Sequence, residues 1–414
     1  MKIIQINTVY KNGGSTGRIV YDLQKMHEHV DIKSYVAYGY KTTSMYFNNT
    51  ICLQGWWRRK WNILKTRLFA CHGFYNKYET NKLIKYLDEI KPDIIHLHNI
   101  HNHYVNVGML FDYIKKNDIP VVWTFHDCWP FTGWCSHFDY AHCDKWITGC
   151  YNCPCKNDYP FTWFFDRSKS NYKKKKKAFC GVNNMILVTP SQWLSSFLPN
   201  SFLKEYPVEV INNGTNTDIF YPMKTNLKER LRISGKKMIL AIAAKLATKK
   251  GGDYLMQITS KLNENEVLVL LGLTTKQVQS LPKEKCIGIT YTNSVQELAE
   301  YYSAADVFIN PTLEDNFPTT NIESLACGTP IVTFKTGGSV EVIDENTGFV
   351  VEQGNLNAML DSMRIILTNG KDYYRNYCRN KAVKMYKNEK QYYKYIELYK
   401  TIISNKLKTD KSYK

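Results

Sequence analysis

Short apolar segments alternate with amphipathic segments along most of the chain. Residues 1–9 (MKIIQINTV) predict a strand, and residues 18–27 predict the helix that follows it. The alternation continues with a strand at 93–100, a helix at 109–116 and a strand at 120–127. This pattern is typical of parallel sheets that are covered by helices on both faces.

A second alternating series fills the other half of the chain. Six apolar segments predict strands there: 238–245, 266–273, 286–292, 307–312, 330–335 and 348–352. Helical segments separate them, and residues 294–305 (SVQELAEYYSAA) form the clearest one. Residues 392–403 repeat tyrosine and isoleucine at helical spacing, which predicts a final helix that packs against the rest of the protein.

The alternation breaks at two places. Residues 127–177 form an insertion rich in cysteine and tryptophan without clear periodicity, and turn residues cluster at 208–226. We therefore expect two Rossmann-like, doubly wound α/β domains that face each other across a cleft, 1–212 and 213–390. Residues 391–414 would add a C-terminal helix that packs back against the rest of the protein, followed by a basic tail.

Composition indicates a globular, cytoplasmic protein. Of the 414 residues, 44% are hydrophobic and 22% are charged. Asn7 and Lys11 interrupt the first apolar run too early for a signal peptide. Other apolar runs fall far short of the ~20 residues that span a bilayer.

The net charge of +18 requires an explanation. Residues 173–177 are five consecutive lysines, and residues 406–414 are also basic. Nucleic acid, an anionic membrane and a solvated surface are all compatible with such clusters. The aromatic residues show no interleaving with basic residues of the kind that stacks bases, so we expect no nucleic-acid partner. A peripheral position at the inner face of the plasma membrane remains open.

A glycine-rich loop follows the first strand directly. Gly13 and Gly14 in KNGGSTGR would let the backbone approach a phosphate at the start of the next helix. The spacing matches neither the dinucleotide nor the P-loop fingerprint, and a tight turn without a ligand is the alternative.

A loop of the second half has a similar position. Lys245 and Lys250 in AAKLATKKGGD follow a predicted strand and would converge on one diphosphate. In a lysine-rich protein, the alternative is a pair of solvated side chains.

Carboxylates then appear in residues 313–330 (LEDNFPTTNIESLACGTP). Pro318 is suited to a helix start, so Asp315 would precede the helix and Glu323 would lie about two turns inside it. Such carboxylates accept hydrogen bonds from sugar and ribose hydroxyls. Helix capping by the first and solvent exposure of the second are the alternative.

Together these motifs resemble the retaining nucleotide-sugar glycosyltransferases of the two-domain GT-B fold, the group 1 or E-x7-E family. The resemblance rests on five segments in the family's order: 13–18 (GGSTGR), 124–127 (TFHD), 212–222 (NNGTNTDIFYP), 245–251 (KLATKKG) and 315–332. It implies a nucleoside-diphosphate sugar as donor and a saccharide or lipid-linked saccharide as acceptor. It also implies retention of configuration in cell-surface polysaccharide synthesis.

The resemblance also implies roles for individual residues. Gly13, Gly14, Lys245 and Lys250 would contact the diphosphate, and Glu323 the ribose. The base would lie near Thr292, Asn293 and Val295, and the sugar near His126, Asp315, Asn316 and Phe317.

Three departures from the family pattern matter. Glu314 and Asp315 both remain candidates for the working acid. Lys245 stands where the family has arginine, which removes the bidentate fork but keeps the charge. Pro318 removes a backbone N–H that would otherwise bind the sugar.

Metal-independent catalysis is expected, because lysines and helix N-termini can stabilise the leaving diphosphate and no D-x-D sequence is present. Two other functions remain open. One is a two-domain nucleotide-dependent sugar epimerase or oxidoreductase, and the other is a basic, zinc-containing nucleic-acid-binding protein.

The cysteine-rich insertion suggests a structural metal. Cys135, Cys143, Cys150 and Cys153 form the best candidate set for zinc, with free buried thiols as the alternative. The insertion resembles that of a capsule- or exopolysaccharide-type bacterial branch of the family. The histidine-rich segment 96–103 is expected to lie at a strand end rather than to bind metal.

Overall fold

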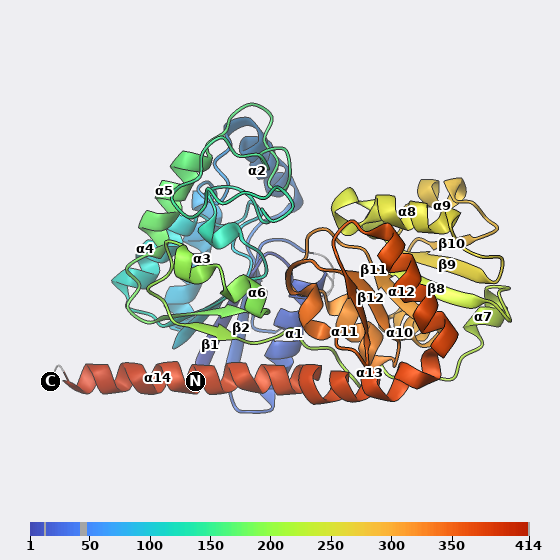
Figure 1. Cartoon of the computed structure of the whole chain (residues 1–414). Helices are drawn as coiled ribbons and strands as arrows, with labels where there is room; N and C mark the ends of the chain where they lie inside the picture. Colours follow the sequence, from blue (N-terminus) through green and yellow to red (C-terminus); the bar gives the residue numbers. More distant parts are fainter. Residues whose placement is uncertain (12–13, 42–47, 413–414) are drawn as a thin grey trace. The chain divides into compact units, whose positions relative to one another are not determined.

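The structure is a computed structural model that describes residues 1–11, 14–41 and 48–412 (Figure 1). The chain forms two compact units of parallel sheet and helices. Unit 1 contains Met1–Ile211 and Tyr392–Lys414, and unit 2 contains Asn212–Gln391. The predicted fold class, two parallel-sheet α/β domains, is confirmed. No helix within the described ranges combines the length and the apolar character that crossing a bilayer requires.

Unit 1 has a seven-stranded sheet in the order β3-β2-β1-β4-β5-β6-β7, and all neighbouring strands in it are parallel. Its strands are β1 (Lys2–Asn7), β2 (Lys33–Tyr38), β3 (Thr50–Cys52), β4 (Ile94–Leu97), β5 (Val121–Thr124), β6 (Met185–Thr189) and β7 (Val208–Val210). Its helices are α1 (Ser15–Glu28), α2 (Trp56–Phe69), α3 (Lys77–Ile90), α4 (Val107–Lys116), η1 (Trp129–Phe131), α5 (Ser168–Phe179), α6 (Gln192–Ser195), η2 (Leu198–Asn200) and most of α14 (Asn388–Ser412).

Unit 2 has a six-stranded parallel sheet in the order β10-β9-β8-β11-β12-β13. Its strands are β8 (Lys237–Ile242), β9 (Glu266–Leu271), β10 (Cys286–Ile289), β11 (Val307–Asn310), β12 (Ile331–Phe334) and β13 (Gly348–Val351). Its helices are α7 (Leu227–Arg230), η3 (Ala244–Leu246), η4 (Thr248–Lys250), α8 (Gly252–Ser260), α9 (Thr275–Ser280), α10 (Val295–Ala304), α11 (Thr319–Ala326), η5 (Gly337–Val342), α12 (Leu356–Asn369) and α13 (Lys371–Tyr386).

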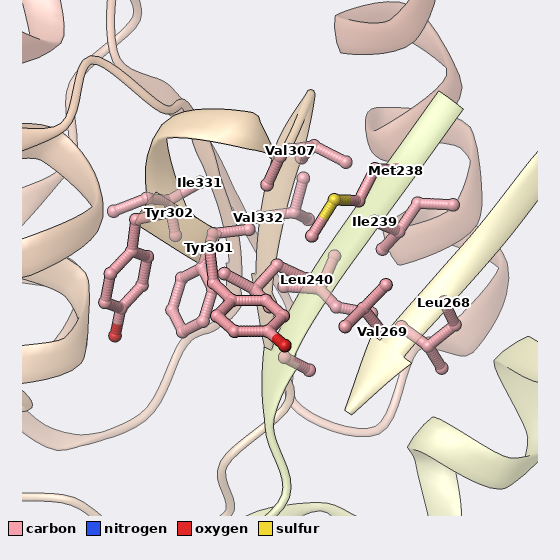
Figure 2. Close-up of a cluster of buried hydrophobic side chains, with 14 of the residues drawn as sticks. Met238, Ile239, Leu240, Leu268, Val269, Tyr301, Tyr302, Val307, Ile331 and Val332 are labelled. Carbon is pink, nitrogen blue, oxygen red and sulfur yellow. The ribbon is translucent and has the colours of Figure 1, made fainter. Parts of the chain in front are cut away.

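The central strands are buried on both faces, which explains their continuous apolar runs. Every residue of β9 is buried, and so is every residue of β4. Figure 2 shows Leu240 and Val269 on adjacent strands of the unit 2 core, in a cluster that also includes Tyr301 and Tyr302. Alternating sides of each strand therefore supply apolar contacts to both helical layers.

The predicted C-terminal helix is present as α14. Its buried side chains Tyr395 and Tyr399 pack in a cluster with Ile3, Ile94 and Val122 of the unit 1 strands. The chain thus returns to unit 1 after completing unit 2.

Both sheets reverse their strand order next to their first strand. In unit 1 the reversal lies between β1 and β4, and in unit 2 it lies between β8 and β11. In doubly wound sheets, ligands bind beyond the carboxyl ends of the strands at such a reversal. Each candidate loop named above follows one of these strands or a neighbour.

The insertion is shorter than the predicted range 127–177. Its last part is helix α5, which includes the lysine run. Lys175 is buried there, and its Nζ donates to the carbonyls of Trp129 at 2.7 Å and Thr132 at 3.0 Å. Because one of the buried positions of α5 is a lysine, the sequence shows no amphipathic pattern there. The lysine run is therefore not simply a solvated charge cluster.

Candidate functional site

Two loops of unit 2 meet beyond the carboxyl ends of β8 and β11. The carbonyl of Lys249 accepts hydrogen bonds from the backbone N–H of Leu313 at 2.9 Å and from Oγ1 of Thr312 at 3.4 Å. Gly251 has φ +78°, and a Cβ built on it would lie 2.1 Å from the carbonyl oxygen of Pro311. Glycine is therefore required for this close approach.

Two ion pairs connect the same loops. Nζ of Lys250 lies 2.6 Å from Oδ2 of Asp315, and Nζ of Lys249 lies 2.9 Å from Oε2 of Glu314. Lys250 also donates to the backbone carbonyl of Glu314 at 2.8 Å. The lysine and the acidic pair that the sequence analysis singled out thus come together at one place.

The two acidic residues have different surroundings. The side chain of Glu314 is 4% exposed and that of Asp315 is 22% exposed. Oε1 of Glu314 makes no hydrogen bond within the described part of the chain. Asp315 is therefore the carboxylate that a ligand can reach from solvent, while Glu314 acts as the buried partner of Lys249.

Lys245 lies on the same loop, and within the described residues its hydrogen bonds go to Gly272 and Gln277 rather than to the acidic loop. Its backbone has φ +61°, its N–H donates to the carbonyl of Gly272 at 2.9 Å, and its carbonyl accepts from Nε2 of Gln277 at 2.8 Å. Its side chain is exposed and forms no ion pair with the described residues. The ammonium group is thus available to an anion.

Glu323 is buried on α11, away from solvent. Its Oε2 accepts a hydrogen bond from the Tyr302 hydroxyl of α10 at 3.2 Å. No contact connects Glu323 with Lys250 or Asp315 within the described structure. A ribose contact at Glu323 therefore remains a prediction.

The residues expected near the base lie at the start of α10. The backbone N–H and Nδ2 of Asn293 donate to Oε2 of Glu297, at 2.6 and 3.0 Å. Thr292 and Val295 are half-buried on either side. The segment is held rigid by this carboxylate.

Asn316 and Phe317 are both buried in the loop that leads to α11. The ring of Phe317 packs against Tyr386, with 5.9 Å between centroids, and its carbonyl accepts from Nδ2 of Asn213 at 3.1 Å. The ring and the carbonyl of Phe317 therefore help to fix the loop in place.

The sequence analysis missed a buried polar network behind this loop. Nδ2 of Asn310 donates to Oδ1 of Asn321 at 2.8 Å, and Nδ2 of Asn321 donates to Oγ of Ser339 at 2.9 Å. Thr333 joins the network through a 2.8 Å contact with Ser339. These residues tie the start of α11 to the ends of β11 and β12. In the sequence, the polar residues at the ends of the apolar strands were the signal that could have predicted this network.

In unit 1, Gly14 precedes the first turn of α1 with φ +88°, and it is exposed. Open space surrounds the position of its missing Cβ. Gly13 lies outside the described residues. A phosphate contact at these glycines stays a prediction.

A chain of hydrogen bonds determines the tautomer of His126. Nε2 of Gln5 donates to the carbonyl of Val20 at 3.1 Å, so Oε1 of Gln5 faces Nε2 of His98 at 3.2 Å and accepts its proton. Nδ1 of His98 must then accept from Nε2 of His126, 3.1 Å away. This leaves Nδ1 of a neutral His126 without a proton and able to accept one.

Burial keeps this chain neutral. It lowers the pKa of His126 to about 4 and the pKa of His98 well below its usual range. Next to His126, Asp127 accepts from Nε2 of His101 at 2.8 Å. Burial raises the pKa of Asp127, but His101, His137 and the backbone N–H of Trp129 together outweigh burial, so the pKa is lowered overall. His126 is thus an uncharged acceptor near physiological pH.

The predicted zinc ligands do not form one group. The thiol of Cys135 interacts with those of Cys153 and Cys155, whereas Sγ of Cys150 accepts from the N–H of Gly133 at 3.1 Å. Among the described residues, no set of three or more His, Cys, Asp or Glu side chains is arranged to hold a metal ion. The predicted quartet that includes Cys143 is therefore not assembled. The histidines of 96–103 likewise form no metal site there.

Two family models match the chain. Residues 223–390 match the model described as glycosyl transferases group 1, and residues 63–219 match the one described as glycosyltransferase family 4. The chain is 24% identical over 373 residues to the putative colanic acid biosynthesis glycosyl transferase WcaC of Escherichia coli strain K12. That alignment covers 85% of this chain and 88% of the relative.

Solved structures resemble the whole fold. Sucrose-phosphate synthase from Thermosynechococcus elongatus superposes with a TM-score of 0.74 at 17% identity, over 98% of this chain and 100% of the other. Anabaena Alr3699/HepE in complex with UDP superposes with a TM-score of 0.66 at 13% identity, over 97% and 100%. At such identities the likeness establishes the fold.

Proposed function

Because the chain belongs to the group 1 glycosyltransferases of the GT-B fold, we propose that it moves a sugar from a nucleoside-diphosphate donor to a saccharide or lipid-linked saccharide acceptor, with retention of configuration. The acceptor belongs to cell-surface polysaccharide synthesis. The relative named for colanic acid biosynthesis supports this assignment. A lipid-linked acceptor would place the enzyme at the inner face of the plasma membrane.

The contact between Lys250 and Asp315 carries the proposal. It lies at the reversal of strand order in unit 2, where a cation and a carboxylate are both partly open to solvent. A diphosphate needs the cation, and a sugar hydroxyl needs the carboxylate. Lys245 adds a second positive charge to the same loop.

In the proposed reaction, the bond between the anomeric carbon and the diphosphate oxygen breaks. The acceptor oxygen bonds to that carbon on the same face, and its proton passes to the departing phosphate. Lys250 and Lys245 stabilise the negative charge that develops on the diphosphate, so no metal ion is required. Asp315 and Nδ1 of His126 accept hydrogen bonds from hydroxyls of the donor sugar and hold it in place.

The remaining contacts bind the nucleotide. Glu323 and the hydroxyl of Tyr302, which already hydrogen-bonds to it, would receive the ribose. The start of α10 around Thr292, Asn293 and Val295 would receive the base. The backbone at Gly13 and Gly14, and of Asn316 and Phe317, would complete the contacts to diphosphate and sugar.

Thermal denaturation with UDP, GDP, ADP and NAD, each in high excess, tests the nucleotide site. A ligand at about 100 times its Kd stabilises the folded state by ~2.7 kcal/mol, which raises Tm by a few degrees. We expect one nucleoside diphosphate to produce this shift and Glu323→Ala to abolish it. A shift with NAD alone would instead support an oxidoreductase.

Product analysis tests the stereochemistry. Once the donor is identified, the anomeric proton coupling of the product should match that of the donor, and a chelator should leave the rate unchanged. An inverted product would overturn the mechanism while leaving the nucleotide site intact.

A further inference from the structure

Helix α2 has its apolar and polar sides reversed with respect to an ordinary surface helix. Its buried residues are Asn62 and Thr66, both polar. Trp56, Trp57 and Trp61, by contrast, are 55%, 77% and 59% exposed. A surface helix normally buries its large apolar side chains. Packing within unit 1 therefore does not account for these tryptophans.

Polar contacts anchor this helix. Oγ1 of Thr66 lies 2.9 Å from Nδ1 of His103, and Nδ2 of Asn62 donates to the buried Glu79 at 3.5 Å. Arg58 also pairs with Glu79, with 2.7 Å between Nε and Oε1. The helix is thus held firmly in an orientation that presents indole rings to solvent.

A second exposed aromatic segment joins the end of α2. The carbonyl of Arg67 accepts from the backbone N–H of Trp163 at 2.9 Å and from Oγ1 of Thr162 at 3.2 Å. Around this anchor, Trp163, Phe164 and Phe165 are 46%, 67% and 50% exposed. We call the exposed aromatic side chains of α2 and of residues 161–165 the aromatic surface. Contiguous exposed apolar groups of this kind mark interaction sites.

The charge of α2 specifies the partner. The helix contains five basic residues and no acidic one. Nζ of Lys60 lies 3.7 Å from the ring centre of Trp56, and the Arg67 guanidinium lies 5.8 Å from those of Phe161 and Trp163. Tryptophans at the level of lipid headgroups, with cations beside them, are the arrangement that binds an anionic membrane surface.

The arrangement of the rings argues against a nucleic-acid strand. Trp56 and Trp57 meet edge to face, with an interplanar angle of 81°, and Phe164 meets Trp163 and Phe165 at 70° and 65°. Stacked bases require ring faces that they can cover in succession. Aromatic and basic residues nevertheless do interleave in α2, which corrects the expectation from the sequence that they do not.

We propose that the aromatic surface docks unit 1 on a lipid bilayer that contains anionic lipids. The surface differs from the lysine run 173–177, since Lys175 of that run is buried. The inference deepens the proposed function, because a lipid-linked acceptor would be reached at the same bilayer. Docking does not involve the nucleotide loops, so the two proposals fail independently.

Co-sedimentation of the full chain with vesicles tests the surface. We expect binding to vesicles of phosphatidylcholine mixed with phosphatidylglycerol, and weak binding to phosphatidylcholine alone. The triple variant Trp57→Ser, Trp61→Ser, Phe164→Ser should reduce binding to the anionic vesicles by roughly tenfold or more. Added salt should weaken the binding of the unmodified chain.

A matched control removes exposed aromatic rings from unit 2. Tyr291, Tyr373 and Tyr377 are 73%, 59% and 51% exposed, and their combined replacement by serine should leave vesicle binding unchanged. Both triple variants should keep the Tm and the nucleotide-induced shift of the unmodified chain. The proposal is overturned if the two variants bind anionic vesicles equally well, or if the unmodified chain ignores vesicles and binds single-stranded oligonucleotides through α2.

Discussion

Nζ of Lys250 lies 2.6 Å from Oδ2 of Asp315, across two loops that are 65 residues apart in sequence. Each loop follows one of two neighbouring strands, β8 and β11, at the reversal of strand order. The pair is charge-neutral and partly open to solvent. A diphosphate sugar can therefore contact both groups directly, because neither charged group has to move out of a buried position.

Replacing Lys250 by alanine should slow transfer strongly while the fold stays intact. The lost cation stabilises charge that develops on the leaving group, so we expect kcat to fall by roughly 10²- to 10³-fold. The pair is partly exposed, so its loss should change the free energy of unfolding by less than about 1 kcal/mol. Initial rates and urea denaturation measure the two effects.

Lys335→Ala is the matched control for this variant. Lys335 also pairs with a carboxylate, Glu352, at 3.0 Å, but both side chains are well exposed. Its removal should leave kcat unchanged. Unchanged turnover in Lys250→Ala would refute the role of the pair.

Gly251→Ala should disrupt the contact between the two loops. Gly235 is a suitable comparison, because both glycines have φ +78° but only Gly251 has a backbone oxygen in the way. Alanine at Gly235 should destabilise the fold by about 1 kcal/mol through backbone strain alone. Alanine at Gly251 should cost about 1–3 kcal/mol more.

Chemical denaturation of the two glycine variants measures this difference. The nucleotide-induced rise in Tm should disappear in Gly251→Ala and persist in Gly235→Ala. Equal destabilisation and retained nucleotide binding in both would show that the loop contact with Pro311 is unimportant.

Gln5→Leu should change the tautomer of His126, although Gln5 does not contact that histidine directly. Without the acceptor at Gln5, His98 no longer has to donate from Nε2, so the hydrogen-bond direction that keeps Nδ1 of His126 unprotonated is lost. We expect kcat to fall by about tenfold or more, with KM changed less. Ring nitrogen chemical shifts of His126 should change from one tautomer to a mixture.

Gln5→Glu keeps an acceptor at the same position and should restore the tautomer of His126 at least in part. If Gln5→Leu leaves the nitrogen shifts of His126 unaltered, Gln5 does not position this histidine and the hydrogen-bond chain has no role in transfer.

Stability should decrease steeply as the pH falls below about 6.5. Burial lowers the pKa of six histidines of unit 1: His27 to about 3, His103 to about 3, His126 to about 4, and His72, His96 and His98 well below the usual range. Between pH ~6.5 and ~4 the unfolded chain therefore binds protons that the folded chain does not. The contribution of these histidines to the free energy of unfolding is therefore fully present above pH ~6.5 and is lost progressively as the pH falls.

Each such histidine contributes a slope of about 1.4 kcal/mol per pH unit in that range. Urea denaturation between pH 5 and 7.5 measures the slope. His27→Gln should reduce the slope by the contribution of one proton. A stability that is independent of pH over this range would contradict the burial of these rings.

The sequence predicted those helices and strands in which the apolar residues lie at the buried positions. Central strands such as β4 and β9 are buried throughout, and α14 carries its apolar residues on the buried side. The strands β2, β3, β6 and β7 of unit 1 were not predicted. The meeting of Lys250 with the acidic loop also followed from the sequence, since loops after neighbouring parallel strands converge. Contacts such as Gln5 with His98 were beyond reach, because they join side chains 93 residues apart.

Among the helices that the sequence analysis did not predict, α5 and α2 were hidden for opposite reasons. α5 places a lysine at a buried position, where backbone carbonyls and the ring of Trp129 accommodate its charge. α2 buries polar residues and exposes aromatic ones, so its apolar pattern points away from the core. When the apolar residues of a helix face solvent, hydrophobic periodicity alone assigns the wrong side of that helix to the core.

The return of α14 to unit 1 affects the order of folding during synthesis. The cluster around Ile3, Ile94 and Val122 includes Tyr395 and Tyr399, which the ribosome adds only after all of unit 2. Until then, that side of the first sheet is covered by α1 but lacks the contacts of α14. A nascent chain would thus carry a complete second unit before the first can close, and that interval is when chaperone capture or aggregation would compete with folding.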